Sequence, residues 1–223
     1  MNNLSYGGTA SIIPPATTAL WYDLTPNNRN GEDHTGGGWP SFDGVGDYVV
    51  APGPYVPPGG GPGTMPIDAN LQTATLEVWI KAAGLALNSR PLMVNSESTV
   101  VYLAIAIIAD GEIRAMVGDA YRAGSAVGLI TVGPWAHVVV TVGSGIAPTI
   151  FLNGVDVTTG PVSVAYPQSD SQICVGAQLY NPGPPPTTTQ RFNGDIDTAR
   201  VYDRILSPDE VLNNFNAGKA AHP

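Results

Sequence analysis

The chain has 223 residues and a formal net charge of -9, with only nine lysines and arginines. This balance argues against binding to nucleic acid or to an anionic membrane surface, because both depend on clusters of basic side chains. Hydrophobic residues make up 43% of the chain, which is enough for a packed core and too much for a disordered protein. With 27 glycines, 21 prolines and 12% charged residues, the composition favours a single domain of many strands joined by turns.

Residues 1–18 predict an extended arm before the domain. Their sequence, MNNLSYGGTASIIPPATT, has neither the basic start nor the apolar stretch of a secretory signal. Two interpretations of the arm stay open: it packs along its own domain, or a neighbouring subunit holds it. No apolar run in the chain approaches the length that a membrane span requires.

The first strands are predicted at residues 19–24, in the second half of 41–50 (SFDGVGDYVV), and at 74–81 (ATLEVWIK). Residues 25–40 and 51–66 separate them and predict loops, since they are rich in glycine and proline. In the third strand, Leu76, Val78 and Ile80 alternate with Thr75, Glu77 and Trp79.

Two hairpins follow. Residues 99–116 predict two strands around Asp110-Gly111, a pair that favours a type I′ turn in which both central residues have positive φ. The strand WAHVVVTV at 135–142 leads to a second hairpin over 149–157, with Asn153-Gly154 at its turn. A short strand at 172–176 contains Cys174, the only cysteine, which we expect to be a buried, inert thiol.

The C-terminal part predicts a last strand and a short helix. Residues 196–202 alternate, which places Asp197 on the apolar side with Ala199 and Val201. Ser207-Pro208-Asp209-Glu210 then reads as a capped helix start, and Gly218 stands where the helix should end.

These segments together resemble the laminin-G-like domains of the concanavalin A-like family. The resemblance rests on FNGDIDTARVYDRILSPDEVLNNFNAG at 192–218, on the Phe-Asp-Gly turn at 42–44, and on Trp135-x-His137 followed by Leu-Asn-Gly at 152–154. It implies an all-β jelly roll of two antiparallel sheets with a short C-terminal helix. The domain would span residues 19–218, with a tail at 219–223.

Catalysis is not expected. Related jelly-roll glucanases use two acids in a Glu-x-Asp-x-x-Glu pattern, and the nearest match here, residues 195–200, ends in Arg200. Of the three histidines, His34 falls in a loop and His222 at a frayed end, while the family resemblance makes His137 structural.

Many relatives hold calcium with oxygen ligands, and the resemblance suggests four aspartates for that role: Asp43, Asp47, Asp195 and Asp197. The alternative is structural hydrogen bonding at strand ends, with no cofactor at all, and it is the interpretation we favour. Arg200 and Arg204 are close enough in sequence to pair with acids.

A glycan site would need exposed aromatic rings beside polar acceptors. Trp39, Tyr55 and Tyr180 lie in or beside predicted loops, and Asn181 follows the last of them. Trp21, Trp79 and Trp135 fall within strands and are expected to be buried.

Two functions fit this pattern. The first is a non-enzymatic virion protein of a bacteriophage, either a capsid decoration or a host-attachment component, bound to other virion proteins or to further copies of itself. Its stiff, uncharged loops at 51–66 and 181–189 would suit packing into an assembly. The alternative is an extracellular or cell-surface adhesion domain that binds carbohydrate like a lectin.

Overall fold

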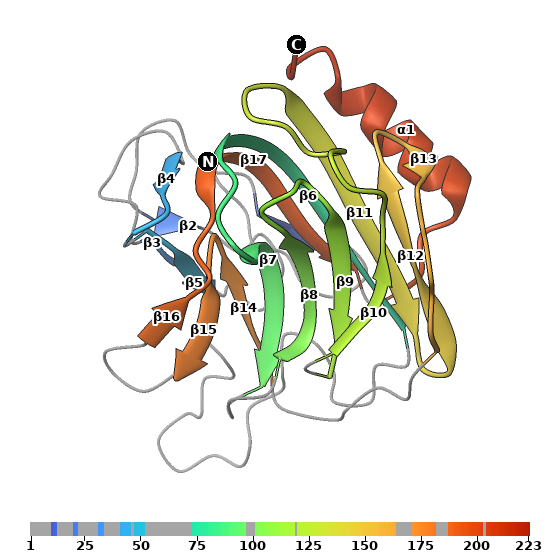
Figure 1. Ribbon diagram of the computed structural model, residues 1–223, viewed down its shortest axis with the longest axis horizontal. Coiled ribbons are helices and arrows are strands. Elements are labelled where there is room, and N and C mark those ends of the chain that lie inside the picture. The colour runs from blue at the N-terminus through green and yellow to red at the C-terminus, as the bar shows by residue number, and fades with distance from the viewer. Residues whose placement is uncertain are drawn as a thin grey trace.

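A computed structural model describes eleven segments of the chain: residues 10–12, 20–21, 31–33, 41–45, 47–51, 73–96, 101–118, 120–163, 171–181, 187–202 and 204–223. Two antiparallel sheets face each other, and one helix covers the outside of one of them (Figure 1). The predicted all-β jelly roll is therefore confirmed. Among the residues just named, no helix is both long enough and apolar enough to cross a bilayer.

The first sheet has seven strands and carries the helix. Along it lie β1 (Ala10–Ile12), β17 (Asn193–Tyr202), β6 (Thr73–Gly84), β11 (Trp135–Gly143), β12 (Ile146–Leu152) and β13 (Val155–Asp156), with β4 (Ser41–Asp43) also paired to β17. Strand β1 belongs to the predicted arm, and it pairs in register with residues 199–201. Residues 10–12 thus lie along their own domain, while the proposed boundaries at 18 and 218 stay predictions.

The second sheet has eight strands. Their order is β10 (Ala120–Gly124), β9 (Ile113–Val117), β8 (Val101–Ile107), β7 (Ser89–Ser96), β14 (Ser171–Val175), β5 (Val49–Ala51), β3 (Gly31–Asp33) and β2 (Leu20–Trp21). A separate hairpin pairs β15 (Gln178–Asn181) with β16 (Thr187–Thr189). Strands β3 and β16 fall inside segments that the sequence predicted as loops, and β7 and β10 were not predicted, because pairing with neighbours rather than local preference makes these strands.

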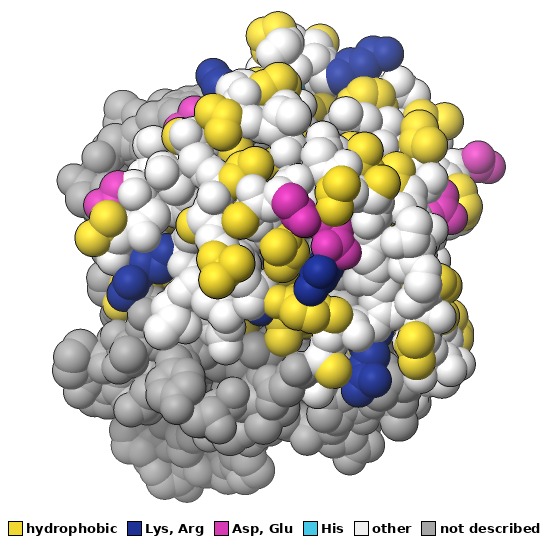
Figure 2. Space-filling view, viewed as in Figure 1, with side chains coloured by type: hydrophobic (Ala, Val, Ile, Leu, Met, Phe, Trp, Pro, Cys, Tyr) yellow, Lys and Arg dark blue, Asp and Glu magenta, His cyan; other side chains and the backbone are white. Residues whose placement is uncertain are grey.

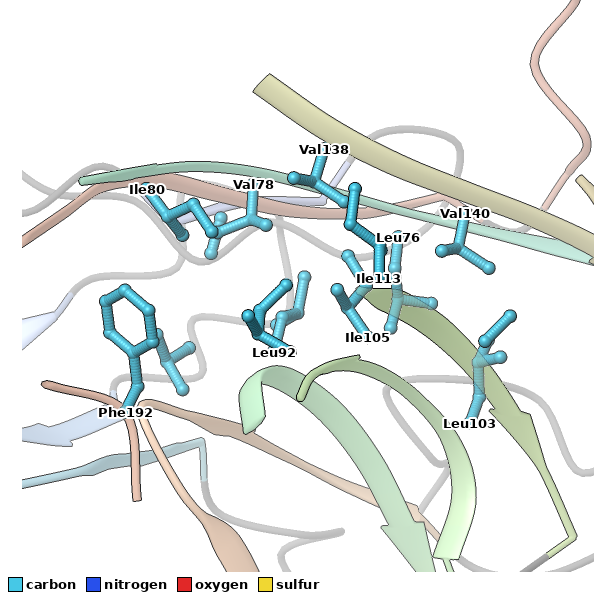
Figure 3. Close-up of a cluster of buried hydrophobic side chains, with 14 of the residues drawn as sticks. Leu76, Val78, Ile80, Leu92, Leu103, Ile105, Ile113, Val138, Val140 and Phe192 are labelled. Carbon is cyan, nitrogen blue, oxygen red and sulfur yellow. The ribbon is translucent and has the colours of Figure 1, made fainter. Parts of the chain in front are cut away.

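The core fills the space between the sheets. Leu76, Val78 and Ile80 of β6 point inward and meet Leu92 and Ile105 from the opposite sheet (Figure 3). All of these side chains are fully buried. Each contributes about 1.5–3 kcal/mol relative to an exposed position, so the two sheets are held together mainly by this layer.

The two predicted hairpin turns differ. The turn predicted at Asn153-Gly154 is present between β12 and β13, and φ values of 51° and 81° make it type I′. At the first hairpin only Gly111 has a positive φ, 80°, so that type I′ prediction is wrong. There Gly111 N donates to Ile108 O within the turn, and Ile130 N donates to Gly111 O from a neighbouring loop.

The last strand carries a bulge that the sequence did not reveal. Ile196 pairs with Ile80 and Thr198 with Trp79, so Asp197 is the extra residue between them. Asp197 therefore does not share the core side with Ala199 and Val201, which corrects the predicted alternation.

Helix α1 (Pro208–Gly218) begins as predicted. The Ser207 side chain accepts from Glu210 N, and the Glu210 carboxylate accepts from Ser207 N, which completes the capping box. At the other end Gly218 lies against the indole of Trp79: a Cβ there would be 2.8 Å from ring atoms. The glycine is thus required by this close approach.

Candidate functional site

Of the residues predicted to bind sugar, only Tyr180 and Asn181 fall within the described part of the chain. Trp39 and Tyr55 lie outside the described residues. Tyr180 and Asn181 belong to β15, where Asn181 pairs with Thr187, so both sit in the small hairpin apart from the two main sheets. Their role in glycan binding stays a prediction.

The four aspartates proposed for calcium divide into two places. Asp43 Oδ1 accepts the backbone N–H of Asp47, and Asp47 Oδ2 accepts that of Asp43, so these two close a turn. Asp195 pairs with Ser41 in the same ladder, but Asp197 binds the C-terminal His222 instead. Within the part of the chain that the structure describes, no three His, Cys, Asp or Glu side chains gather as a metal ion would require. Calcium binding stays a prediction.

A buried polar cluster lies between the seven-stranded sheet and helix α1. Its centre is Glu77, whose side chain is fully buried on β6. Oε1 accepts from His137 Nε2 at 3.0 Å and from Arg200 Nη1 at 2.8 Å. Oε2 accepts from Tyr202 Oη at 2.7 Å and from Asn214 Nδ2 at 2.9 Å. Because three strands and α1 each supply a donor or the acceptor, this cluster fixes the helix to the sheet.

Electrostatics in the cluster favours the ionised carboxylate. Burial by itself raises the pKa of Glu77, but the hydrogen bond from His137 and the charge of Arg200 outweigh it and leave the pKa below its ordinary value. The same carboxylate and burial raise the pKa of Tyr202. All four acceptor directions of Glu77 are used and the group is enclosed, so it suits a structural role, as expected for His137.

The C-terminal tail closes over the same face. His222 stacks on Trp79 with ring centroids 4.0 Å apart, and its Nε2 lies 2.7 Å from Asp197 Oδ2. Its side chain is only 5% exposed. His222 is therefore anchored and not at a frayed end, which corrects the expectation from sequence. A hollow of about 240 Å³ beside it is lined by Trp79, Thr198, Arg200, Asn214, Ala217, Gly218 and His222.

A second polar cluster lies on the outer face of the eight-stranded sheet, and the sequence analysis missed it. Arg90, in β7, is 1% exposed. On the neighbouring strand β8, successive side chains alternate between the two faces of the sheet. Those that enter the core are Leu103, Ile105 and Ile107. Ala104 and Ala106 therefore face outward with Arg90. Because these alanines are small, the arginine reaches across β8 to Met116 of β9.

The guanidinium of Arg90 is only partly satisfied. Nη1 donates to the carbonyl oxygen and the side-chain oxygen of Asn88. Nη2 donates to the sulfur of Met116, a weak acceptor, and the buried Nε has no partner. No carboxylate pairs with this arginine among the described residues, and burial lowers its pKa. Most buried charges are paired, so this one requires an explanation.

The backbone beside Arg90 is unusual as well. Only three described residues other than glycine have a positive φ, and two of them, Asn88 (66°) and Gln190 (49°), flank this site. Arg90 N donates to Gln190 O, and the buried Oε1 of Gln190 has no hydrogen-bond partner. Asparagine adopts this conformation readily in turns, whereas glutamine does so at a cost, so strain and an unpaired polar atom coincide at Gln190.

An aromatic ring borders the cluster. Tyr121, on the edge strand β10, is 38% exposed, and its hydroxyl donates to Asn88 Oδ1. The Tyr121 ring lies 4.7 Å from Arg114 Cζ and 5.9 Å from Arg90 Cζ. Arg114 also pairs with Glu112 at 2.7 Å. Figure 2, which views the same side as Figure 1, shows that charged side chains on this surface are few and lie among hydrophobic and uncharged ones. The signals in the sequence were the two alanines of LAIAI at 103–107 and an arginine just before the apolar residues at 92–94.

Comparison with known proteins places this fold in a family. The family model described as the concanavalin A-like lectin/glucanases superfamily, Laminin_G_3, matches residues 42–212. The chain belongs to this superfamily, as its resemblance to laminin-G-like domains implied. No curated protein matches the chain.

Several solved structures share the fold at low identity. A Trypanosoma rangeli sialidase mutant with trans-sialidase activity superposes with a TM-score of 0.69 at 15% identity, over 97% of this chain and 34% of its own. The chain thus spans about a third of that sialidase. The CBM40 of Ruminococcus gnavus IT-sialidase, bound to α2,3-sialyllactose, gives a TM-score of 0.54 at 16% identity over 66% of this chain and 84% of its own.

Domain 4 of AbnA is similar over nearly all of both chains. It comes from a GH43 extracellular arabinanase of Geobacillus stearothermophilus and was solved with arabinotriose. Its TM-score is 0.53 at 16% identity, over 95% of this chain and 92% of its own. All of these likenesses concern the fold.

Proposed function

We propose that this chain is a non-catalytic carbohydrate-binding module that acts outside the cell and binds glycans on the outer face of its eight-stranded sheet. The observation that carries the proposal is the polar cluster at Arg90, where an exposed tyrosine ring stands beside unsatisfied buried donors and acceptors. Sugar recognition needs this combination, because a ring contacts the apolar face of a sugar while fixed polar groups bond its hydroxyls.

The similar structures support this proposal. Two of them, the CBM40 and domain 4 of the arabinanase, were solved with bound oligosaccharides, and this chain spans 84% and 92% of their lengths. It spans only 34% of the sialidase mutant. The two binding domains are thus matched over most of their lengths, whereas the sialidase is matched over about a third of its chain.

The chemistry of the acidic residues also favours binding without catalysis. A retaining glycosidase places two carboxyl groups about 5–5.5 Å apart in an open cleft. Here Glu77 is enclosed and fully hydrogen-bonded. The carboxylate of Asp197 is bonded to His222.

A glycan array tests the proposal directly. Wild-type protein should bind a defined set of oligosaccharides, and Tyr121→Ala should bind the same set more weakly. Leu212→Ala is the matched control, since Leu212 is 41% exposed on α1 and lies away from the site. Wild-type protein that binds no glycan above background would refute the function.

The virion role expected from the sequence is a separate prediction. The similar structures reported above include no virion protein, so their support goes to the carbohydrate-binding alternative. Mass spectrometry of purified phage particles would test the virion role, and particles without any trace of the chain would end it.

A further inference from the structure

We infer that the glycan recognised by this chain carries a carboxylate, as a sialic or uronic acid does, and that Arg90 binds that group. The inference rests on the proposed function and adds the ligand's chemical class and the residue that selects it. Its basis is the incomplete bonding of one buried arginine.

The free edge of Arg90 has the geometry of a carboxylate site. A guanidinium has five N–H donors, and those of Nη1 are taken by the two oxygens of Asn88. On the edge formed by Nε and Nη2, Nη2 donates to the sulfur of Met116, and Nε has no hydrogen-bond partner. The Tyr121 side chain also interacts with this guanidinium. Two parallel N–H groups on one edge match the two oxygens of a carboxylate.

The energetic cost of burying Arg90 also favours a carboxylate ligand. A buried charge that lacks a partner opposes folding, and an apolar side chain of similar size is often as good or better for stability. Arg90 is also one of only nine basic residues in the chain. A ligand that supplies the missing anion accounts for keeping an arginine here, whereas packing of the strand does not require one.

The neighbouring groups complete a sugar site. The buried Gln190 Oε1 is an acceptor without a donor, which a sugar hydroxyl satisfies. The Tyr121 ring lies 5.9 Å from Arg90 Cζ and is 38% exposed. The inference therefore requires Tyr121 to turn aside when the ligand binds, and β10, which carries Tyr121, has an irregular register between Tyr121 and Ala123.

The experiment compares acidic sugars with neutral counterparts on the full chain by calorimetry. The probes are 3′-sialyllactose against lactose, and trigalacturonate against galactotriose. The acidic member of at least one pair should bind, and its methyl ester, which lacks the charge, should not. Arg90→Lys, which keeps a charge but cannot form two parallel bonds, should weaken binding of the acid on the order of tenfold or more.

Arg204→Lys is the control, because Arg204 pairs with Glu210 on the exposed surface near α1. It should leave binding unchanged, and thermal denaturation should show that both variants are folded. The methyl ester probes the same contact on wild-type protein, so the test holds even if Arg90→Lys is unstable.

The outcomes separate the two proposals. Equal binding of acidic and neutral sugars, or of an acid and its methyl ester, overturns the carboxylate inference and leaves the carbohydrate-binding function standing. Acid binding that Arg90→Lys does not weaken overturns the role of Arg90. If neither these probes nor any glycan on the array binds, the proposed function itself fails.

Discussion

Replacing Glu77 by glutamine tests whether the buried polar cluster holds α1 to the sheet. The amide keeps the size of the carboxylate but turns one oxygen into an N–H donor. Two of the four donors that now bond Glu77 would then face another donor. Arg200 would lose its buried partner at the same time.

We expect Glu77→Gln to lower the free energy of unfolding by a large amount. Removing one member of a buried ion pair destabilises a protein by about 3–5 kcal/mol. For a chain of this length each kcal/mol lowers the melting temperature by roughly 2–4 °C, so the variant should melt roughly 6–20 °C lower. Urea and thermal denaturation followed by circular dichroism measure both quantities. Arg204→Gln, which breaks an exposed ion pair, is the control and should change stability little.

Acid provides a second measure of the same carboxylate. Its folded-state pKa lies below the ordinary value of 4.5, so ionised Glu77 stabilises the fold above that pH. This contribution is lost as pH falls through the folded-state pKa, where the protonated acid resembles glutamine. The difference between wild type and Glu77→Gln should therefore be largest at neutral pH and shrink in acid. A loss below about 1 kcal/mol, the range of an exposed pair, or a difference independent of pH would refute the structural role.

Three further predictions concern other parts of the fold. Gly218→Ala should cost about 1–3 kcal/mol in thermal denaturation, because the new methyl group overlaps the indole of Trp79; an unchanged melting temperature would contradict this packing. Burial raises the pKa of the Cys174 thiol to about 12, so a thiol reagent should modify it only after unfolding; rapid labelling of native protein would show the thiol to be accessible. Asp43 and Asp47 already accept each other's backbone N–H groups, so a chelator should leave the melting temperature unmoved; a lower one, with heat on calcium titration, would establish a metal site.

Much of the fold could be predicted from patterns among residues that lie close together in the chain. The alternation in β6, the Asn153-Gly154 turn and the capping box of α1 all depend on residues within a few positions of each other. Local backbone preference and side-chain periodicity decide such features, so they could be read from the chain. The family resemblance then supplied the two-sheet arrangement that these local signals do not specify.

Features that depend on distant partners could not be predicted in this way. Strands β3 and β10 have weak strand sequences and exist because neighbours pair with them. The bulge at Asp197 reversed the side on which one carboxylate lies, and a one-residue irregularity of this kind leaves no trace in an alternating pattern.

The candidate site shows the same division. By itself the sequence determined that the chain is a β sandwich with a capped C-terminal helix, that it is poor in basic residues, and that it lacks the acid pattern of a glucanase. Only the tertiary structure placed Arg90 beside Gln190 and Tyr121, residues that lie 100 and 31 positions away in the chain. Whether an arginine is paired with a carboxylate depends on which side chains three different strands and their loops place next to it. Those contacts join residues far apart in the chain, so the amino-acid composition cannot predict them.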